Sequence, residues 1–133
     1  MNTITSQPVE ITQGESKTWS LLVTQTTSKT AQNLQGAQVY FTVKSRFENA
    51  APLISKRTAG AGGSDTEVFI VSPQSTAVNT GRVYIYLLPE DTAKLKTGVD
   101  YVFDAWVILG SGEHRPVLRG GRLTVNPRVT VLP

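Results

Sequence analysis

Apolar and polar residues alternate along several segments of the chain. In residues 17–25, KTWSLLVTQ, the apolar positions are Trp19, Leu21 and Val23, and a spacing of two places them on one face of a strand. The same alternation recurs in four later segments, whose apolar sets are Val39, Phe41 and Val43; Val83, Ile85 and Leu87; Tyr101, Phe103, Ala105 and Val107; and Leu123 with Val125. Each segment is therefore predicted to be a half-buried strand.

Shorter β-like runs lie at residues 8–12, 52–56 and 66–71, between turn-rich pieces. A helix is indicated only in PEDTAKLKTG, where a proline and acidic residues come first and Lys96 and Gly98 come last. Many strands with almost no helix favour an all-β, antiparallel β-sandwich of seven to eight strands, with one short helix or turn near residues 90–97. A small barrel is the alternative, because alternation does not show whether a sheet closes on itself.

The chain of 133 residues is predicted to form one domain, with an N-terminal arm at residues 1–8 and a sandwich at 9–133. No segment has the length and apolarity of a membrane span. The start of the sequence lacks the pattern of a secretory signal, so we expect synthesis in a cytoplasm without export by that route. With no cysteine, the fold must depend on core packing.

The net charge is +3, and the Lys and Arg residues are scattered. A nucleic-acid-binding surface needs basic residues gathered where they can neutralise phosphates. We therefore expect neither nucleic acid nor a membrane as a partner.

Four of the ten acidic residues fall between Leu87 and Trp106. Glu90 and Asp91 lie where the short helix would start, a position that favours negative charge. Asp100 and Asp104 would share one face of the next strand about 13 Å apart, at about 3.3 Å per residue. Paired carboxylates that hydrolyse glycosides lie closer, at about 5–9.5 Å. A structural role is therefore expected, with Asp104 partly buried beside an Arg or backbone N–H groups.

No other pattern in the sequence indicates catalysis or a bound ion. His114 is the only histidine, which leaves too few ligands for a zinc site of the usual kind. The glycine-rich piece AGAGGSD lacks the Gly-Lys-Ser/Thr ending of a phosphate loop, and no calcium-loop pattern occurs. We expect no enzyme activity, no cofactor, no metal and no small-molecule substrate.

Several motifs, taken in order, resemble the immunoglobulin-like domains of tailed-bacteriophage structural proteins, including the N-terminal domain of baseplate upper proteins. The resemblance covers about residues 9–130 and depends on short motifs. These are Gly14 to Ser16; Asn33 to Gly36; the series Pro89, Asp91, Thr92, Gly98, Tyr101 and Asp104; and Gly121, Leu123 to Val125 and Val129 to Thr130. It implies an immunoglobulin-like sandwich in which Asp91, Thr92, Gly98, Tyr101 and Asp104 are structural, and it implies no catalytic residue.

In baseplate-type relatives a fibre or receptor-binding portion follows this domain, whereas this sequence stops at Pro133. The resemblance therefore implies a stand-alone virion module, synthesised in the host cytoplasm, that contacts other virion proteins and copies of itself in the tail, baseplate or neck. Capsid-surface decoration or a head fibre is an alternative. The candidate interface residues are Tyr84, Tyr86, Phe47, Arg128 and Val131, since exposed aromatic residues and extended termini suit docking.

A carbohydrate- or receptor-binding sandwich is a further alternative. Sugar-binding surfaces need an exposed aromatic platform with polar groups nearby. Trp19 and Trp106 both lie among apolar residues in predicted strands and are expected in the core, which disfavours this reading.

Overall fold

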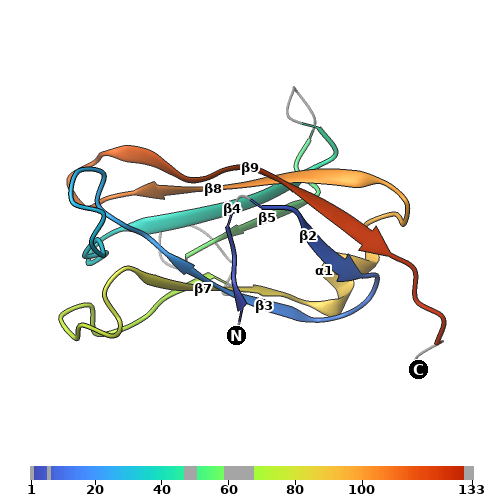
Figure 1. Cartoon of the computed structure of the whole chain (residues 1–133), viewed down its shortest axis with the longest axis horizontal. Helices are drawn as coiled ribbons and strands as arrows, with labels where there is room; N and C mark the ends of the chain where they lie inside the picture. Colours follow the sequence, from blue (N-terminus) through green and yellow to red (C-terminus); the bar gives the residue numbers. More distant parts are fainter. Residues whose placement is uncertain (1, 6, 47–50, 59–67, 131–133) are drawn as a thin grey trace.

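The structure is a computed structural model that describes residues 2–5, 7–46, 51–58 and 68–130. Two sheets face each other, one with strand order β1-β3-β7-β6 and the other with order β2-β9-β8-β4-β5 (Figure 1). The elements are β1 (Asn2–Thr3), β2 (Val9–Thr12), β3 (Lys17–Leu22), β4 (Gln38–Lys44), β5 (Ile54–Arg57), β6 (Val68–Ile70), β7 (Arg82–Leu87), α1 (Pro89–Ala93), β8 (Asp100–Ile108) and β9 (His114–Asn126).

This strand order is that of an immunoglobulin-like sandwich. The order β1-β3-β7-β6 corresponds to the A-B-E-D sheet of that fold, and β4, β8 and β9 correspond to the C, F and G strands. The predicted all-β, immunoglobulin-like class is confirmed. The short helix also forms, at Pro89–Ala93, and no helix in the described ranges has the length and apolarity needed to cross a membrane.

The first two strands differ from the antiparallel pattern of the others. β1 pairs with β3 in parallel, and β2 pairs with β9 in parallel in the opposite sheet. The chain therefore crosses from one sheet to the other between these strands. We expected an arm at residues 1–8, but within this segment Asn2 and Thr3 form β1 and Ile4 is buried, so residues 2–4 belong to the sandwich.

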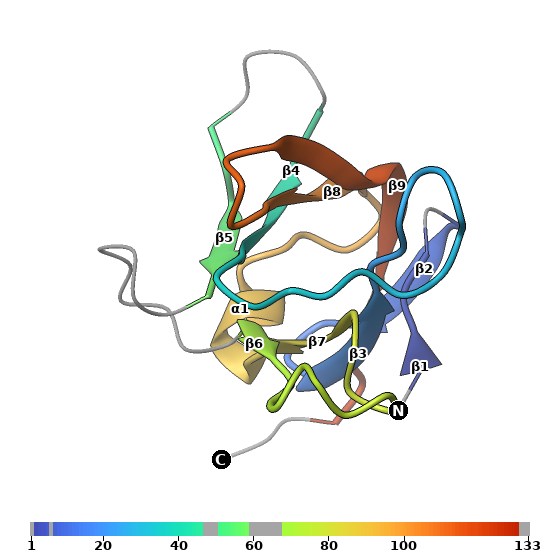
Figure 2. The same ribbon diagram turned by 90° about the vertical axis from the view of Figure 1, so that its left-hand side faces the viewer.

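The core lies between the two sheets (Figure 2). In antibody domains a tryptophan packs on a disulfide between the B and F strands. Here the equivalent strands supply three aromatic side chains, and the Phe41 ring lies 6.0 Å, between ring centroids, from both Trp19 and Phe103. Aromatic packing thus takes the place of a covalent bridge in a chain that has no cysteine.

The β8–β9 hairpin is longer than the alternation predicts, because β9 begins at His114 rather than near Arg122 and ends at Asn126, before Pro127. Gly121 lies opposite Phe103 in this hairpin. A Cβ atom at Gly121 would come within 2.2 Å of the Phe103 ring. The glycine therefore leaves the space that the Phe103 ring occupies.

Candidate functional site

The corner between β7 and β8 contains most of the residues that the sequence marked as structural. Asp91 and Thr92 are buried in α1. An Asp91 carboxylate oxygen accepts a hydrogen bond of 2.8 Å from the Leu88 N–H, which precedes the helix. The carboxylate therefore caps the start of α1, where backbone N–H groups lack intrahelical partners.

Asp91 also forms a buried ion pair. The Lys56 Nζ atom of β5 lies 2.9 Å from Asp91 Oδ2, and the two side chains are only 6% and 8% exposed. The pair therefore joins β5, an edge strand of one sheet, to α1, which follows strand β7 of the other sheet. Lys56 was not predicted as a site residue, because nothing in PLISK shows which of its residues points inward.

Three further hydrogen bonds hold the same corner. The Thr92 hydroxyl donates to the Glu15 carbonyl at 2.7 Å, and the Gly98 N–H donates to the Val125 carbonyl at 3.4 Å. The Tyr101 hydroxyl accepts from the Lys96 N–H at 2.7 Å. A tyrosine at the start of the F strand that bonds to upstream backbone is a tyrosine corner of the immunoglobulin fold.

The other carboxylates of this region do not converge. Asp100 accepts a hydrogen bond of 2.9 Å from the Thr124 hydroxyl and lies 3.8 Å from Arg122 Nη1. Asp104 is half-buried and accepts a bond of 3.3 Å from the Trp106 indole N–H. The Arg or backbone partner that we expected for Asp104 remains a prediction.

His114 is exposed, and its Nδ1 lies 3.0 Å from the Gly112 carbonyl oxygen. Among the residues that the structure places, no group of three or more His, Asp or Glu side chains is arranged to hold a metal ion.

Aromatic side chains gather on the outer face of the β1-β3-β7-β6 sheet. Tyr84 and Tyr86 point outward from β7 and are half-buried. Phe69 of β6 is 46% exposed and lies opposite Tyr84, and its ring packs edge-on against Tyr86 at 5.4 Å. We call Phe69, Tyr84 and Tyr86 the outer aromatic cluster. Alternation predicted the outward tyrosines but missed Phe69, because β6 has only three residues.

The strands around the outer aromatic cluster carry little charge. Thr18 and Ser20 of β3 lie opposite Tyr86 and Tyr84. The residues of β1, β3, β6 and β7 include no Asp or Glu, and their two basic residues, Lys17 and Arg82, lie at strand ends. The face is therefore aromatic and rich in hydroxyl groups.

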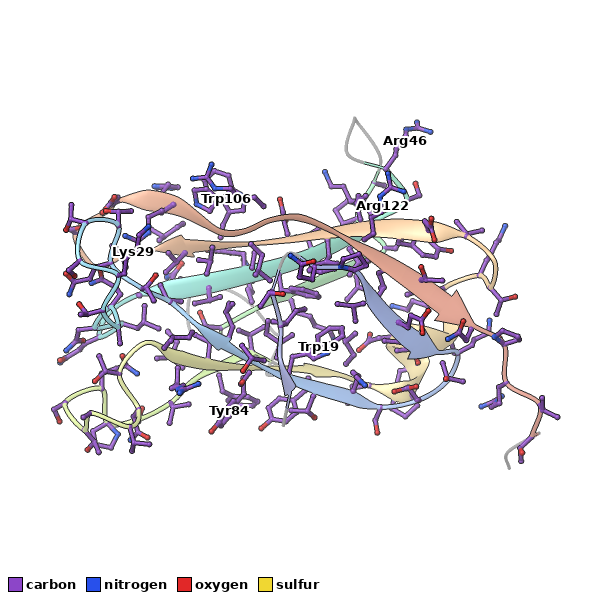
Figure 3. The ribbon with its side chains drawn as sticks, viewed as in Figure 1. Trp19, Lys29, Arg46, Tyr84, Trp106 and Arg122 are labelled. Carbon is purple, nitrogen blue, oxygen red and sulfur yellow. The ribbon has the colours of Figure 1, made fainter. Side chains whose placement is uncertain are left out.

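The opposite outer face contains Trp106, which is 42% exposed. Figure 3 shows Trp106 and Tyr84 on opposite outer sides of the sandwich, with Trp19 between the sheets. The prediction of a core position is confirmed for Trp19 and wrong for Trp106. Tyr101, Phe103, Ala105 and Val107 fill the inner face of β8. Trp106 therefore points outward, beside its register partners Tyr40 and Pro116.

Of the remaining candidate interface residues, the structure describes only Arg128. Arg128 is exposed, and its guanidinium lies over the β2–β3 turn, where a Cβ atom at Gly14 would come within 2.5 Å of Arg128 Nη1. Phe47 and Val131 lie outside the described residues. The structure therefore brings Tyr84 and Tyr86 together and places Arg128 at a different end of the molecule.

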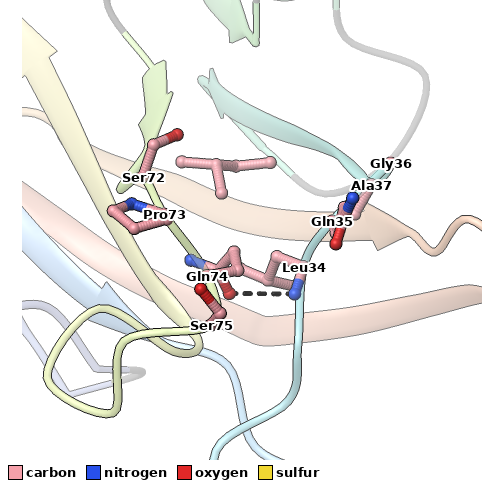
Figure 4. Close-up of a pocket in the computed structure, with 9 residues that line it drawn as sticks. Leu34, Gln35, Gly36, Ala37, Ser72, Pro73, Gln74 and Ser75 are labelled. Atoms are coloured by element: carbon pink, nitrogen blue, oxygen red, sulfur yellow. Dashed lines mark hydrogen bonds between the residues drawn. The ribbon is translucent and has the colours of Figure 1, made fainter.

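A pocket lies at one end of the sandwich, between residues 34–37 and 70–75 (Figure 4). Its wall includes the buried Gln74, which the sequence analysis did not single out. The Gln74 side-chain oxygen accepts from the Leu34 and Gly81 N–H groups at 2.9 and 3.0 Å. Its amide donates to the Val71 and Asn79 carbonyls at 2.7 and 2.8 Å. All four hydrogen-bonding positions of the amide are used, so Gln74 serves to join loops and is not available to a ligand.

No protein-family model matches the sequence. No curated protein matches it either. Among solved structures, AggA, the major subunit of aggregative adherence fimbriae type I from Escherichia coli, is similar with a TM-score of 0.37 and 16% sequence identity, over 95% of this chain and 100% of that chain. A TM-score of this size supports no conclusion about function. The resemblance to bacteriophage domains remains a prediction.

Proposed function

We propose that the protein is a non-enzymatic structural component of a tailed-bacteriophage virion, which acts through protein–protein contacts in the tail, baseplate or neck. The observation that carries this proposal is the outer aromatic cluster, where Phe69 is 46% exposed on a sheet face without acidic residues. The motif order shared with phage immunoglobulin-like domains supplies the setting. A place on the capsid surface, as a decoration or head-fibre protein, would use the same face.

The outer aromatic cluster has the properties of a protein-binding surface. Aromatic residues are enriched in interfaces, whereas Asp, Glu and Lys are depleted from their centres. The Phe69 and Tyr86 rings already pack against each other at 5.4 Å. A partner would therefore meet a preformed surface and lose little side-chain entropy on binding.

Binding to particles that lack the protein tests this proposal. We expect Phe69→Ala to weaken binding by about thirtyfold or more, since interface hot spots contribute about 2 kcal/mol or more. Trp106→Ala is the matched control, because it removes an aromatic ring of similar exposure from the opposite face. If Phe69→Ala is as stable as the parent and binds particles equally well, a role for this face is refuted. Absence of the protein from purified virions by mass spectrometry would refute the virion assignment.

A carbohydrate- or receptor-binding role is the second candidate, and it is favoured by the outward position of Trp106. The exposed indole lies beside Tyr40 and donates to Asp104, and aromatic rings with adjacent polar groups suit sugars. A glycan array distinguishes the two functions. Glycan retention that is lost in Trp106→Ala and kept in Phe69→Ala supports the sugar-binding role, whereas no retention of the parent protein excludes it for the glycans on the array.

A further inference from the structure

The first strand of the sandwich is short. β1 consists of Asn2 and Thr3 and lies parallel to β3, with Thr3 in register with Ser20. The Thr3 and Ser20 hydroxyl oxygens lie 3.2 Å apart, and the Ile4 N–H donates to the Ser20 carbonyl at 2.8 Å. β1 thus occupies the edge of the sheet as a short added strand.

Ile4 provides the apolar anchor of this segment. It is 3% exposed and belongs to the core together with Trp19 and Leu21 of β3. Its neighbours Thr3 and Thr5 are exposed. One isoleucine side chain therefore fills a site between the sheets, in the manner of a strand whose alternate side chains enter pockets of an acceptor.

The chain after Ile4 does not pack closely on the sandwich. A cavity of about 340 Å³ lies between this stretch and the side chains of Lys17 and Trp19. Thr5, Gln7 and Pro8 are exposed. Pro8 disfavours helical conformations at Gln7 and favours extended ones. An extended connection would carry β1 away from its own β3.

We propose that residues 2–5 exchange between copies of this chain, so that β1 and Ile4 of one copy occupy the edge of β3 in a second copy. The inference deepens the proposed assembly function, on which its biological setting rests, by naming a partner. The exchanged segment makes the same contacts in the second copy that it made in its own. The two states therefore differ in free energy only through the connecting residues and the entropy of association. High local concentration, as in a particle, favours it.

Engineered disulfides give a direct test, because the natural chain has no cysteine. Neighbouring strands lie about 4.8 Å apart, within the Cα–Cα range of about 4.4–6.8 Å that a disulfide spans. The double variant Thr3→Cys/Ser20→Cys should form an internal disulfide when oxidised while dilute. Failure to do so would contradict the position of β1 and overturn the proposal.

The decisive experiment mixes the two single variants at high concentration. Thr3→Cys is mixed with isotope-labelled Ser20→Cys, incubated, oxidised and weighed intact by mass spectrometry. Exchange predicts disulfide heterodimers at several times the level given by Thr3→Cys with Thr26→Cys, a control whose cysteine lies in an exposed loop. Heterodimers no more abundant than in the control would overturn the proposal.

A second pair of variants tests the role of Ile4. Ile4→Asp in the Thr3→Cys chain should reduce the heterodimer to the control level, because a carboxylate cannot replace the buried side chain. Thr5→Asp, with the same charge at an exposed position, should leave it unchanged. Equal yields from both would refute the anchor. Particle binding, measured with Phe69→Ala, is a separate readout, so exchange can fail without refuting the assembly function.

Discussion

At the scale of single residues, the buried ion pair between Lys56 and Asp91 has the largest expected effect on stability. Both side chains are more than nine-tenths buried, and the Asp91 carboxylate also caps α1. Replacing such a pair by apolar residues is often neutral, whereas removal of one partner is costly because a charge stays in a region of low dielectric. The pair therefore favours one arrangement of the corner more than it adds net stability.

Asp91→Asn should lower the free energy of unfolding by about 3 kcal/mol. The amide keeps an oxygen for the Leu88 N–H but no longer balances the Lys56 charge. Urea denaturation measures the change. Lys56→Met/Asp91→Asn should recover part of the loss, because it removes the buried charge.

Asp104→Asn is the matched control for this substitution. Asp104 lies on a half-exposed outer face, and its replacement should change stability by less than about 0.5 kcal/mol. If Asp91→Asn and Asp104→Asn unfolded at the same urea concentration, the larger effect predicted for the buried ion pair would be wrong.

Tyr101→Phe should lower stability by about 1–2 kcal/mol, because the Lys96 N–H loses its acceptor while the ring still fits the core. Thermal unfolding followed by circular dichroism measures this loss. Tyr84→Phe, which removes a hydroxyl from the outer face, should unfold like the parent. If Tyr101→Phe unfolded at the same temperature as the parent, water would replace the hydrogen bond of the tyrosine corner without cost in stability.

Sequence reasoning located Asp91 and Tyr101 because each belongs to a local motif. It could not locate Lys56, because the pairing of β5 with β4 determines which side chains of β5 point inward. A lysine is ordinarily exposed, so the residue type alone predicts the opposite of the buried position that Lys56 has.

At the scale of elements, the β8–β9 hairpin depends on the fit between Gly121 and Phe103. Gly121→Ala should lower stability by about 1–3 kcal/mol, because the added methyl group collides with the Phe103 ring. Urea denaturation provides the measurement. Phe103→Leu should be less harmful in the Gly121→Ala chain than in the parent, and additive losses would contradict the contact.

The loops at one end of the sandwich depend on Gln74. Gln74→Ala leaves the Leu34 and Gly81 N–H groups without their acceptor, and each unsatisfied buried group costs about 1–3 kcal/mol. Hydrogen exchange at these two amides should therefore accelerate more than in the core strands. Ser75→Ala, at the exposed neighbouring position, is the control, and equal exchange in both variants would contradict the role of Gln74.

Alternation predicted the inner and outer faces of the long strands, because a period of two is a local property. It could not show whether an outer face is covered, and the expectation for Trp106 failed for this reason. Gln74 lies in a loop, where side chains follow no regular alternation. Its four partners belong to distant or irregular backbone, so no local pattern predicted its position.

At the scale of the whole molecule, the boundary of the domain extends into the segment that we expected to be an arm. Ile4→Ala should lower the free energy of unfolding by about 2 kcal/mol or more, the usual cost of truncating a buried isoleucine. Denaturant unfolding measures it, with the exposed Thr5→Ala as control. Equal stability of the two variants would show that residues 2–5 lie outside the folded unit.

The class of fold could be predicted because many alternating segments and one short helix leave few other architectures. The parallel pairing of β2 with β9 could not, since it joins residues near the two ends of the sequence. No local pattern reports such a pairing.

The pairing of β2 with β9 also constrains the order of folding. During synthesis β2 leaves the ribosome well before β9, its partner, has been made. Contacts this distant in sequence form late, because closing a long loop costs entropy before it gains any contact. Val9 and Ile11 therefore stay without their native neighbours on β9 until β9 has been made. A nascent chain of this protein passes through a stage in which most of the sandwich exists and one sheet edge is still open.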